Sequence, residues 1–185
     1  MGEFLKVLTY QRALTILTEH FGLAGTELMP LESCFDRNLA ADIISPENIP
    51  AFTRSTVDGF AVNCEDSFGS SESLPGMLDD AGSVLMGKTP DFEITAGQCA
   101  WVPTGGMLPT GSNAMVMMEY TERLDEKTVL IFRPVGPWEN VMQVGEDIAA
   151  EELVFHRGQK MRPQDIGLLA SLGIKELSVY KPYRV

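Results

Sequence analysis

The sequence has few of the residues that build metal sites and nucleophile sites. Its three cysteines, Cys34, Cys64 and Cys99, lie far apart without a Cys-x-x-Cys pair, which disfavours both a disulfide framework and a zinc knuckle. We expect three buried or half-buried thiols in a reducing cytoplasm. The only histidines, His20 and His156, lie in stretches of different character, so a histidine metal site is not predicted. No Ser–His–Asp, Cys–His or paired-carboxylate arrangement indicates a hydrolase.

Positive charge and long apolar runs are also scarce. The chain has 14 Lys and Arg against 26 Asp and Glu, a formal net charge of −12. Proteins that bind nucleic acid or anionic membranes need clustered bases, so neither partner is expected. No apolar run approaches the roughly 18 residues that cross a bilayer, and the first residues show no signal-peptide or myristoylation pattern. We therefore predict a cytoplasmic protein.

Glycine and proline, by contrast, are plentiful, with 17 and 11 residues, and this favours many turns and short strands. The hydrophobic fraction of 44% is that of an ordinary globular protein. We predict a β-rich α+β fold. Apolar spacing and turn signals predict helices over 9–21, 31–41 and 163–172, short strands within 51–135, a mobile loop over 67–91 and a strand at 177–179.

The order of these elements predicts a nested organisation. A discontinuous helix-bearing domain would comprise residues 1–50 and 148–185, and an inserted β module would comprise residues 51–147. Charge follows this division, because 55–122 holds ten acids and one base whereas 157–185 holds six bases and two acids. Opposite fields of this kind indicate either domain or subunit contacts or plain solvated faces.

Three stretches carry residues with useful chemistry, and each has a simpler structural interpretation. In 52–62, Asp58-Gly59 signals a hairpin, or a carboxylate at a turn that can hold Mg²⁺ or a ligand hydroxyl. In 102–111, a glycine–proline loop with Thr104 is an ordinary loop, or a nest of amides that binds an anion. It lacks the lysine of a Walker-type loop. In 140–148, Glu146-Asp147 is a solvated turn, or places a carboxylate in a cleft.

Taken in order, these stretches resemble the N-terminal half of the molybdopterin molybdenumtransferase family (MoeA and the gephyrin E domain). The most specific signatures are Ser55-Thr56-Val57-Asp58-Gly59-Phe60-Ala61-Val62 and Thr104-Gly105-Gly106-Met107-Leu108-Pro109-Thr110-Gly111. The whole resemblance runs through nearly the entire chain, at residues 7–14, 37–43, 49–62, 103–111, 145–148 and 158–173.

The resemblance implies an elongated homodimer that inserts molybdate into adenylylated molybdopterin and releases AMP with the help of Mg²⁺. It implies an active site between the β module and a further domain of the partner subunit. The residues that the motifs assign to this half are Asp58, Thr104 and Asp147 as catalytic, Ser55, Gly105 and Gly106 as cofactor-binding, and Asp58 and Asp147 as metal ligands. A molybdopterin adenylyltransferase is an expected partner.

The chain also departs from the family pattern. Met142, Gln143 and Val144 stand where the family tends to have arginine, and Asn113 stands where it usually has Asp. Family members continue into a pterin-binding α/β domain and a small β domain, so we expect the chain to be the first part of a longer enzyme, inactive by itself. The alternatives are a naturally short protein and a non-catalytic dimerisation or scaffolding module of the gephyrin type.

Overall fold

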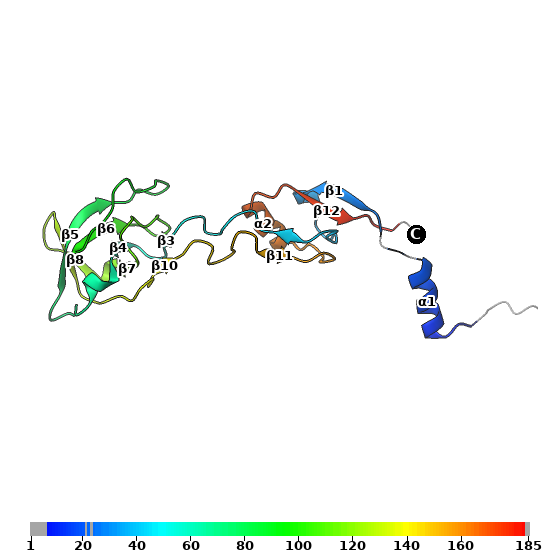
Figure 1. Ribbon diagram of the computed structural model, residues 1–185, viewed down its shortest axis with the longest axis horizontal. Coiled ribbons are helices and arrows are strands. Elements are labelled where there is room, and N and C mark those ends of the chain that lie inside the picture. The colour runs from blue at the N-terminus through cyan, green and yellow to red at the C-terminus, as the bar shows by residue number, and fades with distance from the viewer. Residues whose placement is uncertain (1–6, 21, 23, 184–185) are drawn as a thin grey trace, which may run out of the picture. The chain divides into compact units, whose positions relative to one another are not determined.

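The computed structural model describes residues 7–20, 22 and 24–183, and it divides them into two compact units (Figure 1). The terminal unit consists of the residues up to Ile44 together with those from Leu153 onward. The β unit consists of Ser45–Glu152. The β-rich α+β fold predicted from the sequence is confirmed. No helix within the described ranges has both the length and the apolarity to cross a membrane.

The terminal unit holds two helices and two pairs of antiparallel strands. β1 pairs with β12, and β2 pairs with β11, so each pair joins the beginning of the chain to its end. The core of the unit lies between α2 and the β1–β12 pair, where Leu39, Leu169 and Val179 are fully buried. The elements are α1 (Tyr10–His20), β1 (Thr26–Pro30), the 3-10 turn η1 (Leu31–Ser33), β2 (Ile43–Ile44), β11 (Leu153–Phe155), α2 (Pro163–Ser171) and β12 (Glu176–Tyr180).

Two of the three predicted helices are confirmed. α1 begins after Thr9, whose side-chain oxygen accepts the backbone N–H of Arg12, as an N-cap should. Phe21, the last residue of the predicted stripe, lies outside the described residues. α2 begins at Pro163, where a missing N–H costs nothing, and Asp165 caps it by accepting the N–H of Arg162 at 2.9 Å.

The predicted helix over 31–41 is wrong, since only η1 is helical. Asp36 has a φ of +64°, which no right-handed helix contains. Beyond it the chain is extended, and Asn38 and Leu39 bridge Lys160 and Val179. Leu31 and Leu39 are therefore buried by segments more than a hundred residues away, and their helical spacing is coincidental.

The β unit is built on a six-stranded sheet with the strand order β7-β4-β6-β5-β9-β8. All neighbours are antiparallel except β5 and β6, which are parallel. A separate antiparallel pair joins β3 (Arg54–Ser55) to β10 (Val141–Met142). The remaining elements are β4 (Gly59–Val62), η2 (Cys64–Ser67), β5 (Gly76–Ser83), β6 (Gln98–Val102), β7 (Ala114–Met117), η3 (Met118–Tyr120), β8 (Thr121–Arg123) and β9 (Thr128–Ile131).

Strand β4 is buried on both faces, which is why its sequence Gly-Phe-Ala-Val contains no polar residue. Phe60 and Val62 belong to a core cluster on one side, with Cys99, Val116 and Ile131 among its members. Ala61 belongs to a second cluster with Val102 and Met115. The sheet therefore separates two apolar layers and fixes the position of Asp58, which directly precedes β4.

The predicted mobile loop over 67–91 is wrong, because this stretch contains β5, the longest strand of the unit. It pairs with both β6 and β9. Asp80 lies within it, and its largely buried carboxylate forms an ion pair with Arg123 at 2.6 Å. An acid in a strand interior breaks the apolar alternation by which strands are recognised in a sequence.

Candidate functional site

Asp58 and Thr104, 46 residues apart in the sequence, are in direct contact. The Oδ1 atom of Asp58 accepts the backbone N–H of Thr104 at 2.7 Å and the Thr104 hydroxyl at 3.0 Å. Both side chains are exposed, and no described residue bonds to the second oxygen, Oδ2. One oxygen of the carboxylate is thus held by two donors, and the other remains available to a ligand.

The backbone fixes both partners. Asp58 is held from behind, because its carbonyl oxygen accepts the N–H of Met118 at 3.0 Å. β3 and β4 do not pair, so the hairpin predicted at Asp58-Gly59 is wrong. Gly59 is required for another reason: a Cβ atom there would lie 2.0 Å from the carbonyl oxygen of Val116 in the adjacent strand.

Thr104 sits in a tight β-turn that runs from Pro103 to Gly106. The Gly106 N–H donates to the Pro103 carbonyl at 2.8 Å, and Gly105 has a φ of +80°, as a type II turn requires of its third residue. The Gly105 N–H donates to the carbonyl of Ser55 at 2.8 Å. The amides of residues 104–106 are therefore all used inside the chain, and the anion held at this turn is the Asp58 carboxylate itself.

Ser55 connects the turn to β3. Its N–H donates to the carbonyl of Gly106 at 2.9 Å, and its side chain is 2% exposed. The Ser55 hydroxyl accepts the N–H of Val57 at 3.1 Å and donates to the Val57 carbonyl. Ser55, Gly105 and Gly106 thus lie beside the Asp58–Thr104 pair, and the bonds that they make shape the chain around it.

Asp147 is not bonded to the Asp58–Thr104 pair. Its backbone N–H donates to the carbonyl of Ile49 at 2.9 Å, and its side chain makes no hydrogen bond or ion pair with a described residue. Because β3 and β10 are antiparallel, the segments that carry Asp58 and Asp147 leave this strand pair at opposite ends. The neighbouring Glu146 accepts the N–H of Gln143 at 2.7 Å, which confirms the turn interpretation of this stretch.

The donor set of the β unit fits Mg²⁺ only in a limited way. Nowhere in the described chain do three or more His, Cys, Asp or Glu residues gather as a metal-binding group. Mg²⁺ often uses one or two carboxylates and completes its shell with waters and substrate phosphates. Asp58 could supply one such ligand through Oδ2.

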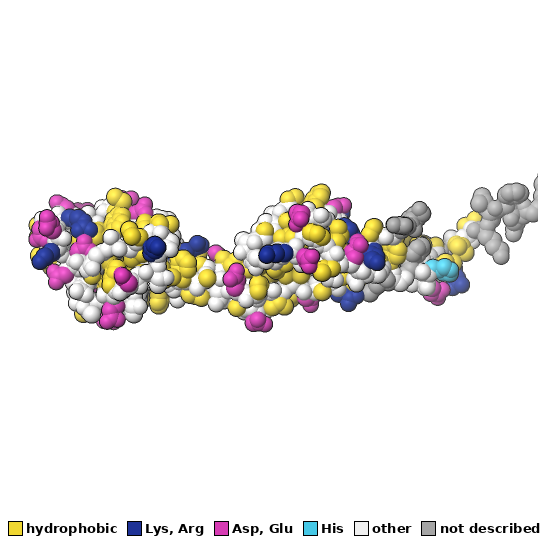
Figure 2. Space-filling model, turned by 90° about the horizontal axis from the view of Figure 1, so that it is seen from above, with side chains coloured by type: hydrophobic (Ala, Val, Ile, Leu, Met, Phe, Trp, Pro, Cys, Tyr) yellow, Lys and Arg dark blue, Asp and Glu magenta, His cyan; other side chains and the backbone are white. Residues whose placement is uncertain are grey.

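The β unit is strongly acidic, with eighteen Asp and Glu against five Lys and Arg. Acidic side chains are scattered over the face of this unit that Figure 2 shows. An anionic ligand would be repelled unless a cation offsets this charge.

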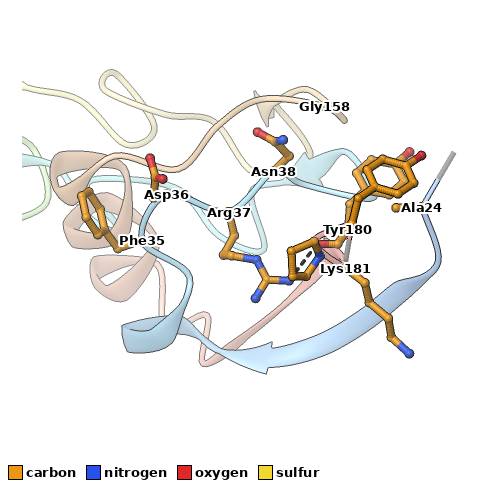
Figure 3. A pocket seen from close by; sticks show the side chains of 10 residues that line it. Ala24, Phe35, Asp36, Arg37, Asn38, Gly158, Tyr180 and Lys181 are labelled. Atoms are coloured by element: carbon orange, nitrogen blue, oxygen red, sulfur yellow. Dashed lines mark hydrogen bonds between the residues drawn. The ribbon is translucent and has the colours of Figure 1, made fainter. Parts of the chain in front are cut away.

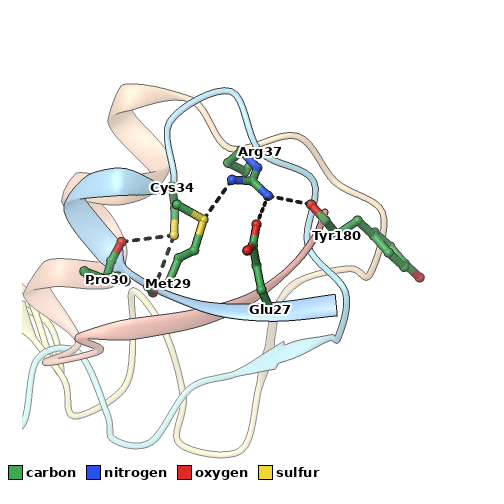
Figure 4. Close-up of polar contacts among 6 residues, drawn as sticks. All are labelled: Glu27, Met29, Pro30, Cys34, Arg37 and Tyr180. Carbon is green, nitrogen blue, oxygen red and sulfur yellow. Dashed lines mark hydrogen bonds and ion pairs between the residues drawn. The ribbon is translucent and has the colours of Figure 1, made fainter. Parts of the chain in front are cut away.

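The terminal unit contains a cavity of about 660 Å³, lined among others by Phe35, Arg37, Tyr180 and Lys181 (Figure 3). Its arginine is already used. The Arg37 guanidinium donates to Glu27 at 2.5 Å and to the carbonyl of Tyr180 at 2.7 Å, and so ties β1 to β12 (Figure 4). Asp36, which also lines the cavity, forms an ion pair with Lys160 at 2.6 Å.

All three cysteines are buried and free, as predicted. Burial raises the pKa of Cys34, whose thiol donates to the carbonyl of Pro30 at 3.2 Å (Figure 4). Burial, and secondly the charge of Asp80, raises the pKa of Cys99 to about 12. The raised pKa values keep the thiols of Cys34 and Cys99 protonated at neutral pH, so these two are not nucleophiles.

The sequence reasoning missed Arg54. It lies opposite Met142 in the β3–β10 pair, and its guanidinium donates to the Met142 sulfur at 3.2 Å. Met142 is one of the residues that stand where the resemblance leads us to expect arginine. The available signal was a base next to Ser55 at the border of an acidic stretch.

The fold and the Asp58–Thr104 pair define a class of protein: a β-rich unit that presents an oriented carboxylate, inserted in a discontinuous unit with two capped helices and two strand pairs. Comparison with known proteins identifies the family. The chain belongs to the family of the MoeA N-terminal region (domain I and II), whose profile matches residues 8–173.

The chain is similar to several molybdopterin proteins. It is 37% identical over 145 residues to a putative molybdopterin biosynthesis protein of Methanocaldococcus jannaschii, which covers 78% of this chain and 34% of that protein. It is 33% identical over 160 residues to a molybdopterin molybdenumtransferase of Haemophilus influenzae, which covers 86% of this chain and 38% of that enzyme. Its fold matches the crystal structure of a molybdopterin biosynthesis MoeA protein from Pyrococcus horikoshii OT3 with a TM-score of 0.87 at 36% identity, covering 95% and 46% of the two chains. The chain thus spans between about a third and a half of its relatives' length.

Proposed function

We propose that this chain supplies the β-unit side of an active site that inserts molybdate into adenylylated molybdopterin and releases AMP. The observation that carries the proposal is the Asp58 carboxylate held by both donors of Thr104. These residues belong to the two signatures that are most specific to the family. The two signatures, 46 residues apart in the sequence, therefore contribute to one site.

The chemistry follows from the charge of the substrates. Molybdate and the phosphates of an adenylylated pterin are anions, and a divalent cation between them and the protein would lower the negative charge at the leaving phosphate. Asp58 is suited to orient such a cation, because Thr104 fixes Oδ1 and no described residue bonds to Oδ2. We assign Asp147 a separate contact with the substrate or cation, made from the loop after β10.

We further propose that the protein acts as a cytoplasmic homodimer supplied by a molybdopterin adenylyltransferase. Three free thiols support a reducing compartment. Helix α1 supports a partner surface, because none of its residues is buried and Leu14 and Leu17 are about half exposed, at 48% and 52%. Replacing both leucines by Asp should shift the mass measured by light scattering from dimer to monomer; an unchanged mass would remove α1 from the interface.

The catalytic proposal is tested by molybdate insertion into adenylylated molybdopterin with the complete gene product. Asp58→Asn keeps the shape of the side chain and removes its charge. We expect the rate to fall by about 10²-fold or more, the size of effect seen when an oriented electrostatic group is lost. Asp91→Asn, which removes the same charge from an exposed position of the β unit, is the matched control and should retain the wild-type rate. A fully active Asp58→Asn enzyme would contradict the proposal.

A further inference from the structure

Arg54 is the one arginine of the β unit without a carboxylate partner. Arg123 pairs with Asp80 at 2.6 Å, and Arg133 pairs with Glu139 at 3.0 Å. Within the described part of the chain, Arg54 bonds only to the thioether of Met142, although the unit holds eighteen acids. A thioether is a weak acceptor, so most of the five guanidinium donors remain available.

The backbone of Arg54 is fixed on both sides. On one side it pairs with Met142 in β10, and on the other it bridges Met107, the residue directly after Gly105-Gly106. The next residue, Ser55, is hydrogen-bonded to the turn that holds Asp58. A half-buried arginine with an ordered backbone and no charged partner is suited to bind an anion, because its backbone needs no further ordering and its planar guanidinium can donate two parallel N–H groups.

We propose that Arg54 binds a tetrahedral oxyanion of the substrate, either a phosphoryl group or molybdate, and positions it next to Asp58. This inference rests on the function proposed above and names the residue that offsets the negative charge of the ligand. A guanidinium fits such an oxyanion because two parallel N–H groups can donate to two of its oxygens. Asp58 and Arg54 then act on opposite charges: the carboxylate orients a cation, and the guanidinium orients the anion.

The register between β3 and β10 provides a sharp test. Because Arg54 and Met142 are directly opposite, exchanging them keeps one guanidinium on the same face of the strand pair, carried by the other strand. The complete gene product is compared as wild type, Arg54→Met, Arg54→Lys and the exchange variant Arg54→Met with Met142→Arg. Lys127→Met, which removes one positive charge on the β8–β9 turn, is the control for the overall field.

Binding of inorganic pyrophosphate and of molybdate is measured separately by calorimetry, after circular dichroism has confirmed folding. Losing a charged hydrogen bond should weaken binding of one anion about tenfold or more in Arg54→Met. The exchange variant should recover most of this loss, Arg54→Lys should lie between, and Lys127→Met should bind like the wild type. The anion that responds identifies the group that Arg54 contacts.

Each other outcome overturns the inference. It fails if Arg54→Met binds both anions as the wild type does, if the wild type binds neither, or if Lys127→Met loses as much affinity as Arg54→Met. The molybdate-insertion rate of the same variants is the separate readout of the proposed function. Arg54-dependent binding without insertion by the wild type would refute the function and leave the anion site standing.

Discussion

Gly59 offers the most direct test of the packing that holds the site. A Cβ atom at this position would lie 2.0 Å from the carbonyl oxygen of Val116, whereas a carbon and a carbonyl oxygen normally stay about 3.3 Å apart. To remove this clash, β4 and β7 would have to separate by more than about 1 Å. Both strands are almost fully buried, so Gly59→Ala should lower the free energy of unfolding by about 3 kcal/mol.

In a chain of this size, such a loss lowers the melting temperature by about 6 to 12 °C, which differential scanning calorimetry measures directly. Gly167→Ala is the matched control. Gly167 is exposed on α2, and a Cβ atom there meets nothing within 4 Å. The same substitution should raise stability at that position by about 0.5 to 1 kcal/mol. A Gly59→Ala protein that melts at the wild-type temperature would refute the close approach of β4 and β7.

Three further predictions concern buried polar groups. Hydrogen bonds from Arg162 lower the pKa of Asp165, so its stabilising effect should be complete above pH of about 4 and be lost as the pH falls through the lowered value; urea denaturation from pH 6 to 2 should show this loss, and it should shrink in Asp165→Asn. Cys99, with its pKa raised to about 12, should react with a thiol reagent at pH 8 only after denaturation, and rapid reaction of the folded protein would contradict its burial. Ser67→Ala should cost about 1 to 3 kcal/mol in denaturant unfolding, because it leaves the buried N–H of Val135 without an acceptor, and an unaffected midpoint would contradict this.

Local sequence signals predicted those elements whose cause is local. α2 begins at Pro163, and β12 shows its alternation because Leu177 and Val179 face the core. The failures have non-local causes. Leu31 and Leu39 have helical spacing, yet segments near the other end of the chain bury them.

The candidate site also combines features that the local sequence shows with features that only the fold shows. Both signatures were recognised from the sequence, but nothing in either one shows that Thr104 donates twice to Asp58. For the glycine–proline loop the sequence left two alternatives, an ordinary loop or an anion-binding nest, and in the structure the amides of residues 104–106 all bond within the chain. Arg54 was missed because its significance depends on the absence of a carboxylate partner, which only the folded β unit reveals.

The central claim is that Thr104 holds the Asp58 carboxylate for catalysis. It is tested most directly by the molybdate-insertion rate of Thr104→Val and Thr104→Ser in the complete gene product. Valine keeps the backbone N–H bond to Oδ1 and removes the hydroxyl bond, whereas serine keeps both donors. The account predicts a loss of about 10- to 100-fold for valine and a much smaller loss for serine. Equal rates for valine and wild type, or equal losses for valine and serine, would contradict it.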